Sequence, residues 1–312
     1  MLSIYIPVYN CATYLPRLIS SLIDLPTSEV QLVFVNDGSS DDSLALIEDF
    51  AVGRPNTVVH SRISNGGVGR AVNDALDLCQ GEWLQRCDAD DEIVAEGVMA
   101  AYRQARDNDY DLILQPFVRV ERDGRSVFRE PEPVAVGETP LQRFWRHGSP
   151  TTCCCLARNR IVREHQIRVP ESLPVGEDRI WMLRFATLLD RDKVACSTQL
   201  SYRYHIRSGS VSHQLPAGKA HLKLLLLDAM LLLGEELVRN GQLEQGFMVE
   251  HLLDGSAASA VRGLVKARRY SQALAEYQRL KMRLGNATVI SNRMRKQFWR
   301  ALLPGIWKLL MP

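Results

Sequence analysis

The sequence lacks several features that would assign it to a specialised class of protein. None of its seven cysteines forms a C-x-x-C pair, and three are consecutive at positions 153–155. Adjacent cysteines suit neither a disulfide framework nor a tetrahedral zinc site, so we expect reduced thiols on a buried strand, in a cytoplasmic compartment. The longest apolar run, 224–233, is interrupted by Asp228 and is too short to cross a bilayer. The N-terminus runs directly into a strand-like stretch, which argues against a signal peptide.

A strong excess of one charge is also absent. The 312 residues carry a formal net charge of +2, and 24% charged and 46% apolar residues are ordinary for a globular protein. The stretch 281–312 is the exception, because its charged residues are all basic and lie among Trp, Phe and Leu. This pattern is typical of a helix bound peripherally to an anionic membrane, and the alternative is a terminal helix packed on the core. No nucleic-acid partner is expected, because the remainder is acidic and carries no known motif.

The first third of the chain alternates strand-like and helix-like stretches. Short β-rich runs predict strands, and apolar residues at helical spacing predict the helices between them. The predicted strands are 2–8, 30–35, 57–61 and 83–87, and the predicted helices are 14–25, 44–50 and 70–79. This alternation predicts an α/β fold with a mostly parallel sheet flanked by helices.

The remainder of the chain is predicted to be mixed and then helical. We expect a strand pair at 112–120 and 126–128 around the turn 122–124, a buried strand at 153–157, a helix at 178–189 and a strand at 200–206. From about residue 218 onward, the spacing of apolar residues predicts helices at 220–239, 243–264 and 271–284.

Polar residues follow three of the predicted strands at the points where these strands end. Asn10, Asp37 and Asp88 come after the first, second and fourth strands. In open α/β sheets, ligands bind outside the carboxyl ends of the strands. The sequence therefore predicts one polar site at this edge of the sheet.

The segment Asp88-Ala89-Asp90-Asp91 places three carboxylates within four residues. Carboxylates this close repel one another unless they lie in water, cap a helix or share a cation. Hard cations such as Mg²⁺ or Mn²⁺ prefer oxygen ligands and complete their shells with water and substrate phosphates. The segment therefore indicates a metal site for a phosphorylated substrate. The alternative is a solvated loop in which an Asp caps the next helix.

Five segments occur in an order and at a spacing that resemble those of a known family. They are Ile4-Tyr5-Ile6-Pro7-Val8-Tyr9-Asn10, Val35-Asn36-Asp37-Gly38-Ser39-Ser40-Asp41-Asp42-Ser43, Asn65-Gly66-Gly67-Val68-Gly69-Arg70-Ala71-Val72-Asn73, the acidic segment 88–91 and Gly176-Glu177-Asp178. The chain resembles the inverting family 2 glycosyltransferases with the GT-A fold, of the type that builds bacterial surface polysaccharides. The resemblance implies a GT-A catalytic domain over 1–215, with a nucleotide-sugar-binding part at 1–110 and an acceptor-side part at 111–215. A helical region with a basic amphipathic tail would follow at 216–312.

The resemblance also implies the residues of a donor and metal site. Asp90 would bind Mg²⁺ or Mn²⁺, Asp88 would contact the metal or the nucleoside ribose, and Asp91 would support the site as a third metal-side carboxylate. The residues expected to contact the nucleotide sugar are Pro7, Tyr9, Asp37, Arg70, Asp88, His205 and Arg207. The alternatives are a helix-capping turn for Asp37, a helix-surface position for Arg70 and a polar strand end for His205 and Arg207.

Inversion at a sugar carbon is a single displacement that needs one general base opposite the leaving group. The resemblance implies Asp178 as this base, with Glu177 as the second candidate. The alternative for both is that acidic residues are favoured in the first turn of a helix, where they interact with the helix dipole.

The implied function is transfer of a sugar from a nucleotide-diphosphate sugar, with a UDP-sugar favoured, to a hydroxyl of a glycan or lipid-linked acceptor on the inner face of the plasma membrane. One alternative is a non-catalytic module that binds nucleotide sugars. Another is a nucleotidyltransferase on a related fold. Such enzymes typically carry glycine and basic residues after the first strand, and the segment 7–13 has neither.

Two positions depart from the family pattern. Asn36 stands where many relatives have an aspartate, which would remove one carboxylate from the nucleotide side of the site. Arg86 and Cys87 precede the acidic segment where relatives usually have apolar residues. Arg86 is expected either to pair with a carboxylate or to cover a strand edge, and the sequence leaves both open.

Overall fold

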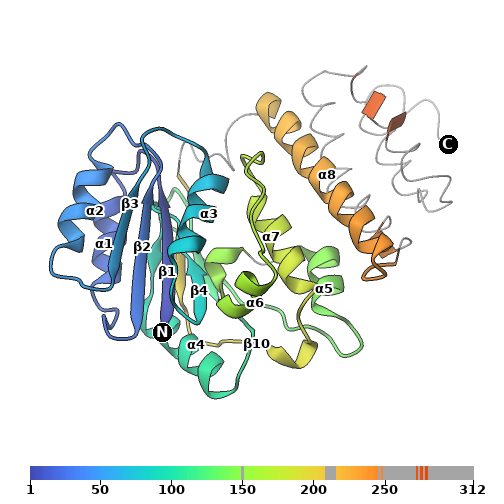
Figure 1. The fold of residues 1–312 in the computed structure, drawn as a ribbon, viewed down its shortest axis with the longest axis horizontal. Coiled ribbons are helices and arrows are strands. Elements are labelled where there is room, and N and C mark those ends of the chain that lie inside the picture. The colour runs from blue at the N-terminus through green and yellow to red at the C-terminus, as the bar shows by residue number, and fades with distance from the viewer. Residues whose placement is uncertain are drawn as a thin grey trace. The chain divides into compact units, whose positions relative to one another are not determined.

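The computed structural model describes residues 1–148, 151–207, 216–244 and 247–248, together with residues 272, 275–276 and 278–279. The chain divides into two compact units, Met1–Arg207 and Ser208–Pro312, which are considered separately below (Figure 1). The predicted boundary at residue 215 falls outside the described residues.

A seven-stranded sheet forms the centre of the first unit. Its strand order is β10-β6-β9-β4-β1-β2-β3. The strands are β1 Leu2–Val8, β2 Val30–Asn36, β3 Thr57–Ser61, β4 Trp83–Arg86, β6 Leu112–Leu114, β9 Cys155–Arg158 and β10 Val194–Cys196. Strands β4, β1, β2 and β3 run parallel, β10 is parallel to β6, and β9 is antiparallel to both of its neighbours. The predicted mostly parallel sheet is therefore confirmed.

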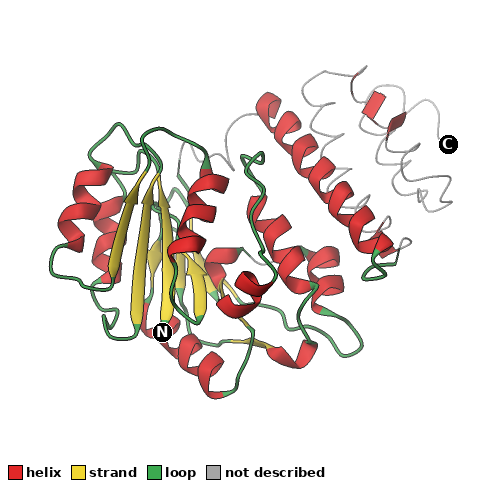
Figure 2. Cartoon of the chain, viewed as in Figure 1, coloured by secondary structure: helices red, strands yellow, loops and turns green. Residues whose placement is uncertain are grey.

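Helices cover both faces of this sheet (Figures 1 and 2). They are α1 Leu15–Leu22, α2 Ser43–Ala51, α3 Val68–Leu78 and α4 Ala95–Asp107. On one face, alternate β1 side chains such as Ile4 and Ile6 share a core with buried residues of α1, α2 and α4. Helix α3 packs against β1 and β2 on the other face. Strand β2 is buried along its whole length, as its apolar sequence predicted.

The predicted strands and helices of the first third are all present. Helix α1 ends at Leu22 rather than at Leu25. Leu25 precedes Pro26, and a residue before proline is pushed away from helical backbone angles, so the helix stops early.

The predicted strand at 112–120 was wrong, because the chain changes sheets within it. Strand β6 ends at Leu114, and β7 Phe117–Val120 belongs to a second sheet of order β5-β11-β7-β8. Pro116 lies between the two strands, where its missing N–H would break a continuous ladder. The other strands of the second sheet are β5 Glu92–Ile93, β8 Ser126–Arg129 and β11 Tyr202–His205. The predicted pairing around the turn 122–124 is confirmed by the antiparallel pair β7–β8.

The three consecutive cysteines are buried and free, as predicted. Only the last lies in a strand, since Thr152–Cys154 form the 3-10 turn η1 and β9 begins at Cys155. Burial raises the pKa of the Cys153 and Cys154 thiols well above the ordinary value, which favours the unreactive thiol form.

Three short elements of the first unit were not predicted: α5 Pro140–His147, α6 Asn159–Glu164 and the 3-10 turn η2 Arg191–Lys193. Helix α7 Glu177–Ala186 was predicted, but at 178–189. Helix α5 begins with a capping box, in which the side chains of Thr139 and Gln142 each accept the other's backbone N–H.

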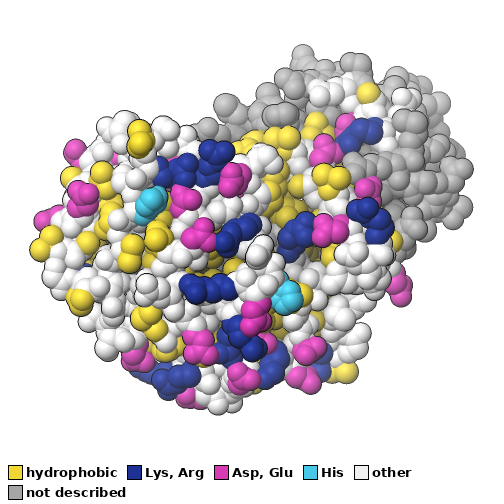
Figure 3. All heavy atoms as spheres, viewed as in Figure 1, with side chains coloured by type: hydrophobic (Ala, Val, Ile, Leu, Met, Phe, Trp, Pro, Cys, Tyr) yellow, Lys and Arg dark blue, Asp and Glu magenta, His cyan; other side chains and the backbone are white. Residues whose placement is uncertain are grey.

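In the second unit, α8 Pro216–Arg239 is described, and the chain then turns at Gly241, whose φ of 70° suits glycine. Most residues of the predicted helices at 243–264 and 271–284, and the whole stretch 285–312, lie outside the described residues, so the membrane prediction for 281–312 stays a prediction. None of the helices in the described part is long and apolar enough to cross a membrane. On the face drawn in Figure 3, basic and acidic side chains of the described residues are interspersed rather than gathered by sign.

Candidate active site

The carboxyl ends of β1, β2 and β4 meet at one edge of the sheet, as predicted. Val8 pairs with Asn36, the last residue of β2, and the Asp37 N–H donates to the Val8 carbonyl at 2.8 Å. The Cys87 N–H donates to the Tyr5 carbonyl at 2.9 Å, just before the acidic segment. The loops that carry Asn10, Asp37 and Asp88 therefore leave the sheet side by side.

Asp37 holds the glycine-rich loop 65–67. Its side chain is buried, and its two oxygens accept the backbone N–H groups of Gly66 and Gly67, each at 2.8 Å. Arg62 adds an ion pair of 3.0 Å to the same carboxylate. Asp37 thus fixes the loop between β3 and α3 at the site edge, and its contact with a nucleotide base stays a prediction.

Asn36, the residue that departs from the family pattern, is hydrogen-bonded on both of its side-chain polar atoms. Its side-chain N–H donates to the Ser61 hydroxyl at 2.9 Å, while its oxygen accepts the Ser39 N–H at 3.3 Å. A carboxylate lacks the donor for the first of these bonds. Asn36 therefore joins the ends of β2 and β3 beside the site.

The remaining residues expected to contact the nucleotide lie around the same edge. Tyr9 is half exposed just beyond β1, and Pro7 is part of β1 opposite Val35. Arg70 lies on α3 with an exposed side chain that pairs with Glu171 at 2.8 Å. Pro7 and Tyr9 are therefore next to Asp37, whereas Arg70 is engaged with Glu171 through its Nε.

The first two carboxylates of the acidic segment have cationic partners. Asp88 accepts a hydrogen bond from Arg86 Nε at 2.7 Å. Asp90 forms an ion pair with Arg207, and its backbone carbonyl accepts from Arg17. The structure thus pairs each of these two carboxylates with a different arginine.

The third carboxylate of the segment, Asp91, has neutral partners. It is buried. One oxygen accepts a hydrogen bond from the Tyr202 hydroxyl at 2.8 Å, and the other accepts one from the backbone N–H of His205 at 2.7 Å. Burial, then the charge of Asp88, raises the pKa of Asp91 well above its ordinary value. The helix-cap alternative for this segment was wrong, because the N-cap of α4 is Val94 without a side-chain cap. Asp91 instead joins the acidic segment to β11.

Asp88 and Asp90 are the candidate pair for the metal ion that the sequence predicts. Burial, then the charge of Asp88, raises the pKa of Asp90, so the two carboxylates repel each other. A hard divalent cation would relieve that repulsion, and carboxylate oxygens are the ligands it prefers. Among the described residues, no group of three or more His, Cys, Asp or Glu side chains is arranged to hold a metal. Two carboxylates with substrate phosphate and water as further ligands would suit Mg²⁺ or Mn²⁺.

His205 and Arg207 contact the acidic segment rather than open solvent. The His205 ring faces the Glu92 carboxylate, and burial is the largest cause that lowers the pKa of His205. The Arg207 guanidinium lies 4.7 Å from the centre of the Tyr14 ring while it pairs with Asp90. Both residues are therefore beside the acidic segment, and their contacts with the nucleotide sugar stay predictions.

The start of α7 supplies the candidate general base. Gly176, with φ of 82°, precedes Glu177 and Asp178 in the first turn, and Asp178 accepts the Arg179 N–H at 2.8 Å. Burial, then the charge of Glu177, raises the pKa of Asp178 to about 6. A carboxylate whose pKa approaches neutrality is matched to proton abstraction near pH 7. Glu177 is buried and paired, which makes it the weaker candidate.

Arg86 pairs with carboxylates, which resolves the question that the sequence left open. Its buried guanidinium contacts Asp88 at 2.7 Å and Glu177 at 2.8 Å. The sequence feature that indicates such a role is a basic residue at the end of an apolar parallel strand.

Three further residues of the site were not predicted: Arg17, Arg62 and Tyr202. Arg17 follows Tyr14 by one helical turn. Tyr202 lies in the same segment as His205 and Arg207, but its contact with Asp91 spans 111 residues of sequence, so the sequence did not indicate it.

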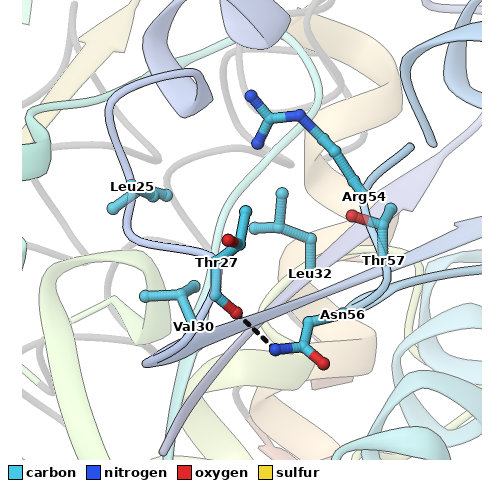
Figure 4. A pocket seen from close by; sticks show the side chains of 7 residues that line it. All are labelled: Leu25, Thr27, Val30, Leu32, Arg54, Asn56 and Thr57. Carbon is cyan, nitrogen blue, oxygen red and sulfur yellow. Dashed lines mark hydrogen bonds between the residues drawn. The ribbon is translucent and has the colours of Figure 1, made fainter. Parts of the chain in front are cut away.

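A separate pocket lies at the opposite end of the sheet, where β2 and β3 begin (Figure 4). It is lined by Leu25, Thr27, Val30, Leu32, Arg54, Asn56 and Thr57. The Asn56 side chain bonds the Thr27 carbonyl across it, and Arg54 lies over the Phe50 ring at 4.4 Å. The side chains of Asn56 and Arg54 are engaged within the protein, and none of the lining residues is at the acidic edge.

Known proteins resemble this chain in sequence and in structure. The poly(ribitol-phosphate) beta-glucosyltransferase of Bacillus spizizenii is 26% identical over 211 residues, which are 66% of this chain and 32% of that protein. The poly(ribitol-phosphate) beta-N-acetylglucosaminyltransferase TarS of Staphylococcus aureus is 27% identical over 208 residues, 65% of this chain and 35% of TarS. The chain thus spans about a third of the length of these relatives.

Solved structures of TarS from S. aureus share the fold. The complex of TarS 1–349 with UDP has a TM-score of 0.67 at 19% identity, covering 99% of this chain and 92% of that one. The complex with UDP-GlcNAc has a TM-score of 0.61 at 22% identity, covering 96% and 79%. The family model described as Glycosyl transferase family 2 matches residues 3–165, which is more than half of the chain. The chain belongs to glycosyl transferase family 2 and has the GT-A fold.

Proposed function

We propose that the chain is a metal-assisted inverting glycosyltransferase that uses a UDP-sugar and has Asp178 as its general base. One observation carries the proposal: the acidic segment and the start of α7 lie close together, because the Arg86 guanidinium contacts Asp88 at 2.7 Å and Glu177, the neighbour of Asp178, at 2.8 Å. The charge of Asp88 is also one cause of the raised pKa of Asp178. A metal-side carboxylate and a base are both needed for this reaction.

The residues divide the chemistry between leaving group and nucleophile. A Mg²⁺ or Mn²⁺ ion on Asp88 and Asp90 would neutralise the charge that develops on the diphosphate. Asp178 takes the proton of the acceptor hydroxyl, and that oxygen forms the new bond to the anomeric carbon. The bond from this carbon to the diphosphate oxygen breaks, and its electron pair leaves with UDP. One displacement inverts the configuration.

The protein groups around the leaving group support this division. Arg207 and His205 border Asp90 and Asp91, where they can donate hydrogen bonds to phosphate oxygens once the donor enters. Asp37, Pro7 and Tyr9 lie at the nucleotide side of the same edge. Asp91 does not act as a ligand in this proposal, because Tyr202 and His205 occupy its oxygens.

The relatives support the choice of donor and acceptor. TarS has been solved with UDP and with UDP-GlcNAc, and a mannosyltransferase of Pyrobaculum calidifontis with GDP-Man and Mn²⁺ has a TM-score of 0.55 to this chain. Two relatives are named for poly(ribitol-phosphate) acceptors. We therefore propose a hydroxyl-rich polyol-phosphate or glycan chain as acceptor.

Transfer of labelled sugar to an acceptor polymer tests the proposal. The protein is incubated with UDP-glucose, UDP-GlcNAc and UDP-GalNAc in turn, with Mn²⁺ and poly(ribitol phosphate), and labelled sugar on the polymer is counted. We expect transfer from one donor, loss of transfer on chelation, and no transfer by Asp178→Asn. Donor and Mn²⁺ binding without transfer to this or a glycan acceptor would instead support a non-catalytic binding module.

A further inference from the structure

Arg86 connects two parts of the site that are far apart in sequence. Its side chain is 9% exposed, and it lies at the end of β4. Nε donates to Asp88 at 2.7 Å, and Nη1 donates to Glu177 at 2.8 Å across 91 residues of sequence. One buried guanidinium therefore joins the acidic segment to the first turn of α7.

We propose that Arg86 is a positioning residue for sugar transfer: it holds the start of α7 against the acidic segment and engages Glu177, so that Asp178 alone faces the acceptor hydroxyl. This inference rests on the proposed function. It assigns a task to a residue that departs from the family pattern.

The type of residue supports this role. Arginine presents several N–H donors in a rigid plane, so it can hold two carboxylates from different elements at once. Lysine offers a single point charge on a flexible stem. Arg86 uses two different nitrogens for its two partners. The distance between acidic segment and helix is therefore set by the width of one guanidinium.

Stability alone does not account for a buried ion pair here. Removing charges from water is costly, and a well-packed apolar pair is often as stable as a buried ion pair. Glu177 is 6% exposed on its side chain, so its desolvation is nearly complete. A pair retained at this position is better explained by the geometry that it imposes on the neighbouring base.

The test uses Arg86→Met and the double variant Arg86→Met/Glu177→Met in the full chain. We expect Arg86→Met to lower kcat about 100-fold, as for a base displaced by about 1 Å, with a smaller change in the donor KM. Arg86→Met also leaves Glu177 buried without its partner, so its melting temperature should fall. The double variant should recover most of the melting temperature and little of the kcat. If the double variant recovered kcat together with its melting temperature, Arg86 would be a structural residue only.

Arg158→Met is the matched control. Arg158 is also buried and pairs with carboxylates, Glu82 and Asp111 among them, at the start of β4 rather than at its end. We expect this variant to melt earlier but to keep the kcat of the unmodified protein below its melting temperature. An equal loss of kcat in both variants would show that Arg86 is not a positioning residue for sugar transfer.

Hydrogen–deuterium exchange separates this inference from the proposed function. Exchange of the backbone N–H groups at 178–182 should rise in Arg86→Met and in the double variant, and should be unchanged in Arg158→Met. This readout does not require turnover. If no UDP-sugar is used but exchange rises as expected, the proposed function fails and the structural tie stands. Unchanged exchange in the Arg86 variants would show that Arg86 does not hold the start of α7 against the acidic segment, whatever the activity.

Discussion

Two buried arginines at opposite ends of β4 make similar ion pairs in different surroundings. Arg158 on β9 lies opposite Trp83 at the start of β4, with its guanidinium 4.2 Å from the centre of that ring. Its partners Glu82 and Asp109 have side chains that are 56% and 74% exposed. Arg86 at the end of β4 has Glu177 as a partner, whose side chain is 6% exposed.

The difference lies in what happens when the arginine is removed. Water can solvate Glu82 and Asp109, and the third partner, Asp111, keeps 17% of its side chain exposed. The loss of Arg158 should therefore cost mainly its hydrogen bonds and packing, about 1–3 kcal/mol. Water has little access to Glu177, so the loss of Arg86 leaves a buried charge, at about 3–5 kcal/mol. A buried carboxylate beside Asp178 also changes the electrostatics of the proposed base. We therefore expect Arg86, at the end of β4, to affect both stability and activity, and Arg158, at its start, to affect stability alone.

The largest expected effect on activity is that of a substitution at Asp178, beside the Arg86 end of β4. Asp178→Asn removes the proton acceptor but keeps the shape of the side chain, so kcat should fall about 1,000-fold or more. Donor affinity, measured by calorimetry with Mn²⁺ present, should change less than about threefold. Normal turnover by this variant would show that Asp178 is not the base.

Asp90→Ala should give the next largest effect. It removes one of the two carboxylates that fit the metal, so Mn²⁺ should no longer raise the affinity for UDP, which we expect to weaken about 10- to 100-fold. Asp109→Ala is the control, because it removes a carboxylate from the Arg158 end of β4. An Mn²⁺ effect that survives in Asp90→Ala would contradict the metal assignment.

The pH dependence of kcat/KM should also distinguish Arg86 from Arg158. The base form of Asp178 is the ionised one, and its pKa is about 6, so kcat/KM should fall about tenfold per pH unit below pH 6. Arg86 faces Asp178 together with the carboxylates of Glu177 and Asp88, and its charge lowers this pKa. Arg86→Met should therefore move the acid limb to higher pH, while Arg158→Met leaves it in place. An acid limb that stays near pH 4 in the unmodified protein would exclude Asp178.

Glu177→Gln should give the smallest effect on activity. The amide oxygen can still accept from Arg86, so the first turn of α7 keeps its position and kcat should fall less than about tenfold. The measurement is kcat at pH 7.5 beside Asp178→Asn in the same assay. A loss as large as that of Asp178→Asn would make Glu177 the better candidate for the base.

The edge of the sheet could be predicted because its signals are local. Each of β1, β2 and β4 is a short apolar run that ends in polar residues, and parallel strands bring such ends together. The change of sheet at Pro116 was also readable, since proline within a strand argues against a continuous ladder. The apolar residues on both sides of Pro116 favour one continuous strand instead, and this pattern outweighs the proline in the sequence.

The contacts within the site could not be predicted, because they depend on distant partners. Asp91 was expected to support a metal site, yet its partners Tyr202 and His205 lie more than 100 residues away and are brought in by β11. The choice of Arg86 between a carboxylate and a strand edge depended on where α7 begins in space. Residue types indicate which partners are chemically suitable, and the packing of the elements selects among them.

The stereochemistry of the product tests the central claim most directly. The proposed reaction is one displacement, with Asp178 on the face opposite the diphosphate. The product formed from a UDP-α-sugar should therefore carry a β-linkage, which the coupling constant of the anomeric proton reports by NMR. An α-linked product would require a second displacement or a front-face attack, and would contradict the assignment of Asp178 as the base of an inverting transfer.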